Sequence, residues 1–232
     1  MSRLNGSIRY GTSPIIANMA QFKGILFDND GTLVDTEMLI LESMRYSTRT
    51  VLNRIIPDET LMRKVGQPLA VQMRDFTDDV LKQEEILRVY REYNHALHDE
   101  AVKAFPGVVE GLAKLSEAGC ALGVVTSKLH ALAWRGLEIT GCAPYLDCCI
   151  GADDCDTFKP EPGPVLLGCE KLGVSPAECL YVGDSPFDIC AGNAAGCATV
   201  AALWGMFGAD ELRLESPTFE CATFEELVSV LL

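Results

Sequence analysis

The sequence has few basic residues, no pair of cysteines at the spacing of a CxxC motif, no internal repeat and no low-complexity tract. Its 19 lysines and arginines stand against 33 acidic residues, which gives a formal net charge of -14. Such a charge repels the backbone of nucleic acids and anionic membrane surfaces, so the sequence argues against both kinds of partner. A small anionic substrate stays compatible, because local lysines and a divalent cation can reverse the sign of the charge within one pocket.

The missing CxxC motif also bears on the ten cysteines, which all lie between Cys120 and Cys221. Several of them, such as Cys169, Cys179 and Cys197, have apolar neighbours in the sequence. We therefore interpret the cysteines as reduced core residues. This interpretation excludes a disulfide framework and a zinc site.

The first 20 residues contain only one short apolar patch, Pro14-Ile15-Ile16-Ala17, which is too brief for a signal peptide or a membrane span. We therefore expect a cytoplasmic protein in which residues 1–20 form an N-terminal extension that need not be ordered. Because Met19 lies four residues before the first predicted strand begins at Lys23, residues 1–18 are expected to be dispensable for solubility and activity.

The first informative stretch is an apolar run, Ile25-Leu26-Phe27, that ends in two carboxylates, Asp28 and Asp30, followed by Gly31. The run predicts a buried strand. In open α/β sheets ligands bind at the carboxyl ends of the strands, so a carboxylate pair at this point suggests chemistry. The alternative is an acidic turn, because Asp-Gly is a common turn dipeptide.

The spacing of apolar residues changes twice along the chain. Residues 36–101 have helical apolar spacing and predict an all-helical insert, and we assign 36–103 to a cap domain and 21–35 with 104–232 to a core domain. After residue 104, strands predicted at 121–125, 146–150, 180–182 and 199–202 alternate with helices at 105–117, 131–139, 164–172, 187–195, 209–214 and 224–231. This alternation favours right-handed crossovers and a parallel sheet that is covered on both faces.

Polar residues follow three further strands of this predicted sheet. Thr126 and Ser127 offer a hydroxyl and a backbone N–H to an anion. Lys159 follows the third strand, and Asp184 and Asp188 follow the fourth. Each group has a local alternative: a helix cap, a surface lysine, or negative charge at a helix start. Four such groups at the ends of four successive strands are hard to explain as independent caps, so we predict one site.

Taken in order, these polar residues resemble the four motifs of the haloacid dehalogenase superfamily. The matching residues are Asp28-Asn29-Asp30-Gly31-Thr32, Thr126, Lys159-Pro160, and Gly183-Asp184 with Asp188. The resemblance covers the chain from Lys23 onward, and residues 90–99, 105–108 and 125–128 are similar to the pyrophosphatase and phosphoglycolate phosphatase branches. It implies a Rossmann-like, doubly wound parallel sheet with an inserted small helical cap of the C1 type.

The resemblance also implies a set of roles. Asp28 is the nucleophile that forms an aspartyl-phosphate, and Mg²⁺ is held by Asp28, the main-chain carbonyl of Asp30, and Asp184. Asp188 is a second metal ligand or an orienting neighbour. The Asp30 side chain protonates the leaving group and then activates water, which requires a raised affinity for its proton. The charge of Lys159 offsets the repulsion between nucleophile and substrate.

The phosphoryl group is expected to contact Thr126, Ser127, Asn29 and Gly31, with Gly31 present because a side chain would crowd the phosphate. The loop Val65-Gly66-Gln67-Pro68-Leu69 corresponds to a cap loop involved in substrate choice, and residues 204–208 are similar to the phosphoglycolate phosphatase branch. His95 and His98 have helical spacing but no third ligand nearby, so we expect a pair on the helix surface that packs at the cap hinge and binds no metal.

We therefore predict a Mg²⁺-dependent phosphohydrolase that acts on a small phosphorylated metabolite, with pyrophosphate and 2-phosphoglycolate as the favoured substrates. It would be a monomer or a weak homodimer. The alternative enzyme is a sugar phosphomutase like β-phosphoglucomutase, which shares every core motif. A binding or regulatory domain is disfavoured, because none of the motif residues is missing.

Overall fold

The computed structural model of the chain describes residues 22–232. The predictions made for residues 1–20, including the dispensable segment 1–18, lie outside this range. Within it, no helix combines the length and the apolar character needed to cross a bilayer.

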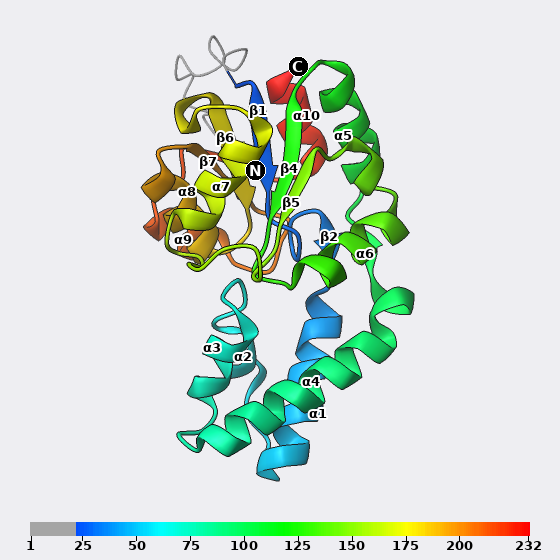
Figure 1. Cartoon of the computed structure of the whole chain (residues 1–232), viewed down its shortest axis with the longest axis vertical. Helices are drawn as coiled ribbons and strands as arrows, with labels where there is room; N and C mark the ends of the chain where they lie inside the picture. Colours follow the sequence, from blue (N-terminus) through cyan, green and yellow to red (C-terminus); the bar gives the residue numbers. More distant parts are fainter. Residues whose placement is uncertain (1–21) are drawn as a thin grey trace, which may run out of the picture.

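A six-stranded sheet forms the centre of the molecule (Figure 1). From one edge to the other its strands are β5 (Cys148–Ile150), β4 (Ala121–Val125), β1 (Gly24–Phe27), β6 (Cys179–Gly183), β7 (Ala198–Ala202) and β8 (Phe219–Cys221). Every neighbouring pair is parallel. The predicted parallel α/β sheet is therefore confirmed, and β1 lies between β4 and β6 in its interior.

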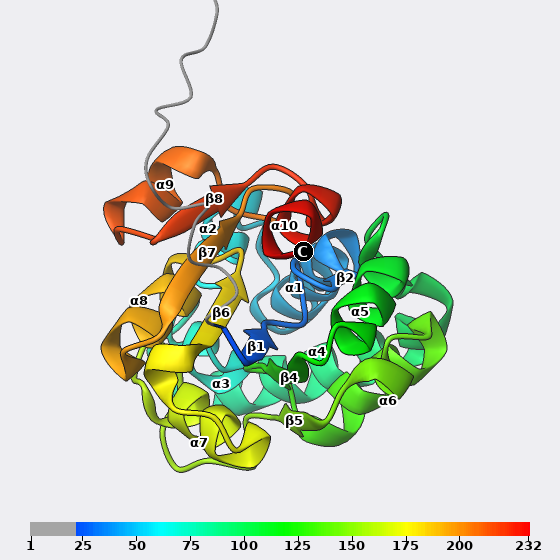
Figure 2. The ribbon, with the colours of Figure 1, turned by 90° about the horizontal axis from the view of Figure 1, so that it is seen from above.

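Helices cover both faces of this sheet, as the view from above shows (Figure 2). One face carries α5 (Val108–Glu117), α6 (His130–Thr140) and α10 (Phe224–Leu231), and the other carries α7 (Gly163–Leu172), α8 (Pro186–Ala195) and α9 (Ala209–Leu214). Ile25 and Phe27 belong to the first core and Leu26 belongs to the second. Successive side chains of a strand point to opposite faces, so a strand covered on both sides needs the continuous apolar run that the sequence contains.

A helical insert, residues 37–101, lies between β1 and β4 along the chain, and the assignment of 36–103 to a separate cap domain stays a prediction. It contains α1 (Glu37–Leu52), α2 (Asp58–Met62), α3 (Leu69–Gln72), the short 3-10 helix η2 (Met73–Asp75) and α4 (Val80–Ala101). These helices group below the sheet in Figure 1. They share a core of their own that includes Met44, Leu61, Phe76 and Ile86.

The chain enters and leaves the insert through two short antiparallel strands, β2 (Val34–Asp35) and β3 (Lys103–Ala104). The sequence predicted neither of them, nor β8. Two or three residues are too few to display a strand periodicity, and these strands exist because of partners that are distant in the sequence. The remaining predicted strands and helices of the core are present, with ends that differ by a few residues.

Candidate active site

The carboxyl ends of three neighbouring strands bring the predicted polar residues together. Asp28 follows β1, Thr126 follows β4 and Asp184 follows β6, while Lys159 comes from the loop between β5 and α7. All four side chains are buried. In a parallel sheet these ends share one edge, which is why residues more than 150 positions apart become neighbours.

Lys159 lies between two carboxylates. Its Nζ donates to Asp28 Oδ1 at 2.9 Å and to Asp188 Oδ1 at 2.6 Å. The other donors to Asp188 are the hydroxyl of Tyr181 on Oδ1, at 3.0 Å, and the N–H and hydroxyl of Ser185 on Oδ2, at 3.0 and 2.5 Å. Because both oxygens of Asp188 already accept two hydrogen bonds each, the geometry favours the orienting role over direct metal coordination.

The buried carboxylates outnumber the buried cation. Burial and the charge of Asp188 raise the pKa of Asp28 to about 7, although Lys159 acts in the opposite direction. Burial and the charges of Asp28 and Asp188 hold the pKa of Asp184 well above its usual range. Burial alone would lower the pKa of Lys159, but the two carboxylates outweigh it and raise that pKa, so Lys159 stays cationic.

This excess of negative charge suits a divalent cation. Asp28, Asp184 and Asp188 each offer a carboxylate oxygen, and these oxygens lie within 4.8 Å of one another. Mg²⁺ prefers hard oxygen ligands, so Asp28 and Asp184, whose oxygens accept at most one hydrogen bond each, fit it as ligands, with Asp188 as their neighbour. The Asp30 carboxylate does not belong to this group, and its predicted contribution through the main-chain carbonyl stays a prediction.

Asp184 is held in place by its own donors. Thr32 Oγ1 donates to its Oδ1 at 3.1 Å, and the N–H of Met206 donates to its Oδ2 at 2.8 Å. Gly31 has φ +88, and a Cβ at this position would lie 2.2 Å from Asp184 Oδ2. The glycine is therefore required by the close approach of the Asp184 carboxylate, whereas the sequence interpretation expected a side chain there to crowd the phosphate.

The Asp30 side chain is not a member of this carboxylate group and is bound by three donors. Lys128 Nζ and Thr36 Oγ1 both lie 2.7 Å from its Oδ1, and Asn29 Nδ2 lies 3.1 Å from its Oδ2. Burial alone would raise the pKa of Asp30, but Lys128, assisted by Thr36 and Asn29, outweighs burial and lowers it. The expectation of a raised proton affinity was therefore wrong for this arrangement, because the contact with Lys128 is not visible in the sequence.

The four predicted phosphate-binding residues separate into two pairs. Thr126 and Ser127 line the cavity described below, whereas Asn29 and Gly31 are not among its lining residues in the described part of the chain. Thr126 is not a helix cap, because α6 begins at His130 with no side-chain cap. The Ser127 hydroxyl donates to the carbonyl of Gly66 in the insert, at 2.6 Å.

A cavity of about 300 Å³ lies between the insert and the core, with Asp28, Asp30 and Lys159 in its wall. The insert supplies most of its apolar lining, namely Ile40, Met44, Val65, Pro68, Leu69, Ala70 and Tyr90, and the core adds Leu129, Leu132 and Ala152. Its other polar lining residues are Gln67, Gln72, Arg91, Asn94, His95, Thr126, Ser127 and Lys128. The site therefore combines a charged end at the sheet with a mixed apolar and polar wall from the insert.

The two histidines of α4 differ in environment. His95 is exposed and lines the cavity, whereas His98 is buried with its Nδ1 3.1 Å from Asp99 Oδ1. The expectation of a surface pair is therefore wrong for His98. Partial burial, assisted by the charges of Arg91 and Lys128, lowers the pKa of His95, so this ring is neutral at pH 7.

The sequence assigned no role to several residues of the site. They are Thr32, Thr36, Lys128, Tyr181, Ser185 and Met206. Lys128 had the clearest available signal, since it directly follows Thr126 and Ser127. Met206 lies in the segment 204–208, which is similar to the phosphoglycolate phosphatase branch, but that similarity implies no role for Met206.

Comparison with known proteins agrees with this geometry. A family model described as haloacid dehalogenase-like hydrolase matches residues 25–202. A protein of Caldanaerobacter subterraneus subsp. tengcongensis, provisionally named pyrophosphatase PpaX, is 38% identical over 207 residues, covering 89% of this chain and 93% of that relative. Pyrophosphatase PpaX of Bacillus velezensis is 34% identical over 206 residues, with coverages of 89% and 94%.

Solved structures agree as well. The crystal structure described as a predicted phosphoglycolate phosphatase from Haemophilus somnus superposes with a TM-score of 0.80 at 26% identity, and covers 91% of this chain and 99% of its own. The family match includes β1 and its two aspartates, the insert, Thr126, Lys159 and Asp184. The chain therefore belongs to the haloacid dehalogenase-like hydrolase family.

Proposed function

We propose that the protein is a Mg²⁺-dependent phosphohydrolase that cleaves a small phosphorylated metabolite through an aspartyl-phosphate on Asp28. The observation that carries the proposal is the position of Asp28: Lys159 holds one of its oxygens, and the carboxylate lines the cavity together with Asp30. A carboxylate that attacks a phosphate needs fixed positive charge and in-line positioning, and Lys159 meets the first need.

Asp28 and Asp184 would hold Mg²⁺ together with the main-chain carbonyl of Asp30. When bound, the ion supplies positive charge to the phosphoryl oxygens. The other polar contacts of this region serve to keep the ligands in position. Thr32 and Met206 orient Asp184, and Asp188 orients Lys159.

In the first step an oxygen of Asp28 forms a bond to phosphorus while the bond from phosphorus to the leaving oxygen breaks, and that oxygen takes a proton from Asp30. In the second step Asp30 takes a proton from a water molecule, which attacks the phosphorus and releases phosphate and free Asp28. Asp30 is ionised next to Lys128. We infer that an arriving phosphate draws Lys128 away, so that the buried Asp30 takes up a proton from solvent before it donates one to the leaving oxygen.

The helical insert, residues 36–103, would act as a cap over the core formed by residues 21–35 and 104–232. The paired strands β2 and β3 connect the two parts, and the hydrogen bond from Ser127 to Gly66 joins them at the cavity. A closed cap excludes water from the cavity, and an open cap releases phosphate.

The favoured substrates are pyrophosphate and 2-phosphoglycolate. Two relatives carry the name pyrophosphatase, and a structural neighbour is described as a phosphoglycolate phosphatase. Both substrates have a second anionic group beyond the phosphate that is attacked. Lys128 and Arg91 line the cavity and supply cationic partners for such a group.

One observation favours a second candidate, a phosphorylated sugar that is either hydrolysed or isomerised as by a β-phosphoglucomutase. The side-chain oxygens of Gln67 and Gln72 are buried, have no hydrogen-bond partner within the described residues, and belong to side chains that line the cavity. A buried acceptor without a donor is unfavourable by about 1–3 kcal/mol. Sugar hydroxyls would supply donors, whereas ionised pyrophosphate has none.

The test is a panel of phosphate compounds that includes pyrophosphate, 2-phosphoglycolate and β-hexose 1-phosphates, measured with Mg²⁺ and after its removal by a chelator. Mg²⁺-dependent phosphate release is expected from at least one of the first two, and Asp28→Asn should abolish it. Conversion of a hexose 1-phosphate to its 6-phosphate without phosphate release would instead identify a mutase. Near wild-type turnover by Asp28→Asn, or no Mg²⁺-dependent reaction with any compound, would refute the proposal.

A further inference from the structure

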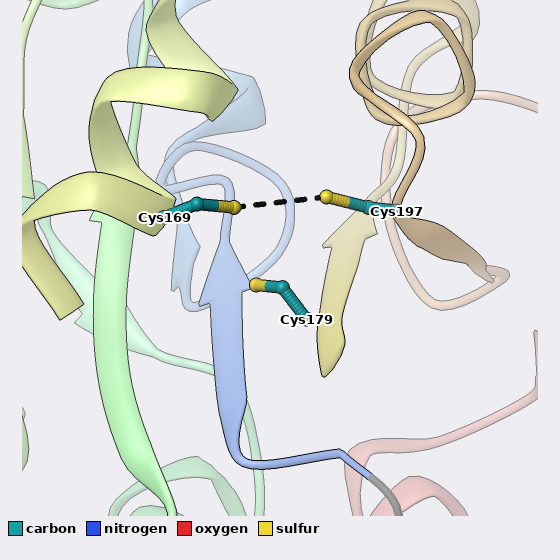
Figure 3. A group of neighbouring side chains, drawn as sticks. All are labelled: Cys169, Cys179 and Cys197. Atoms are coloured by element: carbon teal, nitrogen blue, oxygen red, sulfur yellow. Dashed lines mark hydrogen bonds between the residues drawn. The ribbon is translucent and has the colours of Figure 1, made fainter. Parts of the chain in front are cut away.

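Three cysteines meet near the amino-terminal ends of β6 and β7, at the end of the sheet opposite the active site. Cys169 lies in α7, Cys179 is the first residue of β6, and Cys197 directly precedes β7. Their exposed fractions are 1%, 0% and 7%. Figure 3 shows the sulfurs of Cys169 and Cys197 pointing toward each other, with the sulfur of Cys179 beside the line that joins them.

The separations between the sulfur atoms match those around a metal ion. The Sγ atoms of Cys169 and Cys197 are 3.8 Å apart, and all three Sγ atoms lie within 4.8 Å of one another. An ion about 2.3 Å from each of three thiolates, the length of a zinc–thiolate bond, separates the sulfurs by about 3.8–4.0 Å. Only a small movement of Cys179 would bring its sulfur to this distance.

The number of sulfurs distinguishes a metal site from a disulfide. A disulfide joins two cysteines and would leave the third thiol unpaired among apolar side chains, whereas one ion engages all three. The surroundings include Leu26, Val165 and Ala191, whose side chains offer the sulfurs no polar partner.

The same surroundings select the ion. Structural zinc takes four ligands, and the described residues add no fourth histidine, cysteine or carboxylate to this group. The apolar side chains of this shell also offer a water ligand no hydrogen-bond partner. Cu(I) is a soft cation that prefers thiolates and is stable with three of them, so it fits a dry site with three sulfurs.

We propose that Cys169, Cys179 and Cys197 form a three-sulfur binding site for Cu(I) in the core of the protein. Binding involves no redox step: copper stays Cu(I), and each thiol that becomes a thiolate releases a proton to solvent. The site is separate from the phosphatase chemistry, because β6 runs from Cys179 to the residue before Asp184, and five strand residues span about 16 Å. The sequence interpretation excluded zinc from the absence of a CxxC motif, and it had no means of detecting this group.

The test uses the full chain, expressed in copper-supplemented medium and purified reduced and without oxygen, so that slow access to a buried site does not mask binding. We expect one copper per chain that resists a chromogenic Cu(I) chelator, an ultraviolet thiolate-to-copper charge-transfer band, and about three sulfur neighbours by X-ray absorption. Retention of the ion should decrease toward acidic pH, because protons compete for the thiolates.

Single replacements Cys169→Ala, Cys179→Ala and Cys197→Ala should each release the copper to the chelator. Cys142→Ala and Cys221→Ala are the matched controls, since both are buried cysteines outside the group and should retain it. Mg²⁺-dependent phosphate release by every variant reports that it is folded. Copper content that is absent in the wild type, equal in all variants, or replaced by zinc would overturn the proposal, as would a disulfide within the group in the anaerobically purified protein.

Discussion

Replacement of Lys159 by methionine separates the charge of this residue from its volume. Lys159 is 1% exposed and donates to Asp28 and Asp188 at 2.9 and 2.6 Å. Methionine fills similar space without a charge. Loss of a preorganised donor at a site of developing charge costs about 2.7–4 kcal/mol, so kcat should fall by about 10²–10³-fold or more.

The variant should also have a distinctive pH profile. Without Lys159, burial and the charge of Asp188 act unopposed on Asp28 in the metal-free protein, so its pKa rises beyond about 7 and a proton competes with Mg²⁺ for this carboxylate. The activity that remains should therefore increase toward alkaline pH more steeply than in the wild type. The measurement is kcat and kcat/KM for Mg²⁺-dependent phosphate release across the pH range.

Two further variants control for stability and for unspecific effects. Removal of one partner of a buried ion pair destabilises a protein by about 3–5 kcal/mol, so thermal melting must confirm that Lys159→Met is folded. Lys159→Met with Asp188→Asn should regain stability but not activity. Lys114→Met, at an exposed position of α5, should change the rate by less than about twofold. A folded Lys159→Met variant that loses less than about tenfold in kcat would show that Lys159 has no catalytic role.

The remaining predictions concern the other charged and crowded positions of the site. Lys128→Met should raise the pKa of Asp30 and extend the activity toward alkaline pH for alkyl phosphates, whose leaving group needs a proton. An unchanged dependence of kcat on pH would show that Lys128 has no part in the acid–base step. In the metal-free protein the pKa of Asp28 is about 7, against an unfolded value near 4. This difference adds up to roughly 4 kcal/mol to the free energy of unfolding below about pH 4, and the contribution is lost as the pH rises through about 7. Mg²⁺ should therefore raise the melting temperature more at alkaline than at acidic pH, and an equal increase at both would contradict a metal site at these carboxylates. Gly31→Ala should raise the Mg²⁺ concentration that gives half of the maximal rate by at least about tenfold, because its Cβ would lie 2.2 Å from a metal-site oxygen. Gly119→Ala has a similar backbone, φ +86, with nothing within 4 Å, so it should lose stability but keep its Mg²⁺ response.

The sequence was sufficient for the fold class because local patterns carry that information. The run Ile25-Leu26-Phe27 has the continuous apolar character of a strand covered on both faces, and the two aspartates after it mark the carboxyl end. The later motifs do the same for the neighbouring strands. Short strands without a periodicity of their own, β2, β3 and β8, were the elements that local patterns could not predict.

The protonation and pairing of the site depend on contacts that no local pattern contains. Lys128 reaches Asp30 across 98 positions, and Thr32 reaches Asp184 across 152. The same holds for Cys169, whose sulfur lies 3.8 Å from the sulfur of Cys197 because the two residues pack in the same core.

The sequence by itself thus determined which residues end the strands and which chemical groups they contribute, because apolar runs and the polar residues after them are read in order along the chain. Only the tertiary structure decided which charge neutralises which. The strand order β5-β4-β1-β6-β7-β8 sets the neighbours of each strand end, and electrostatic interactions depend on distance in space. For this reason Asp28 acquires a raised pKa and Asp30 a lowered one, although the two aspartates stand two positions apart in the same motif.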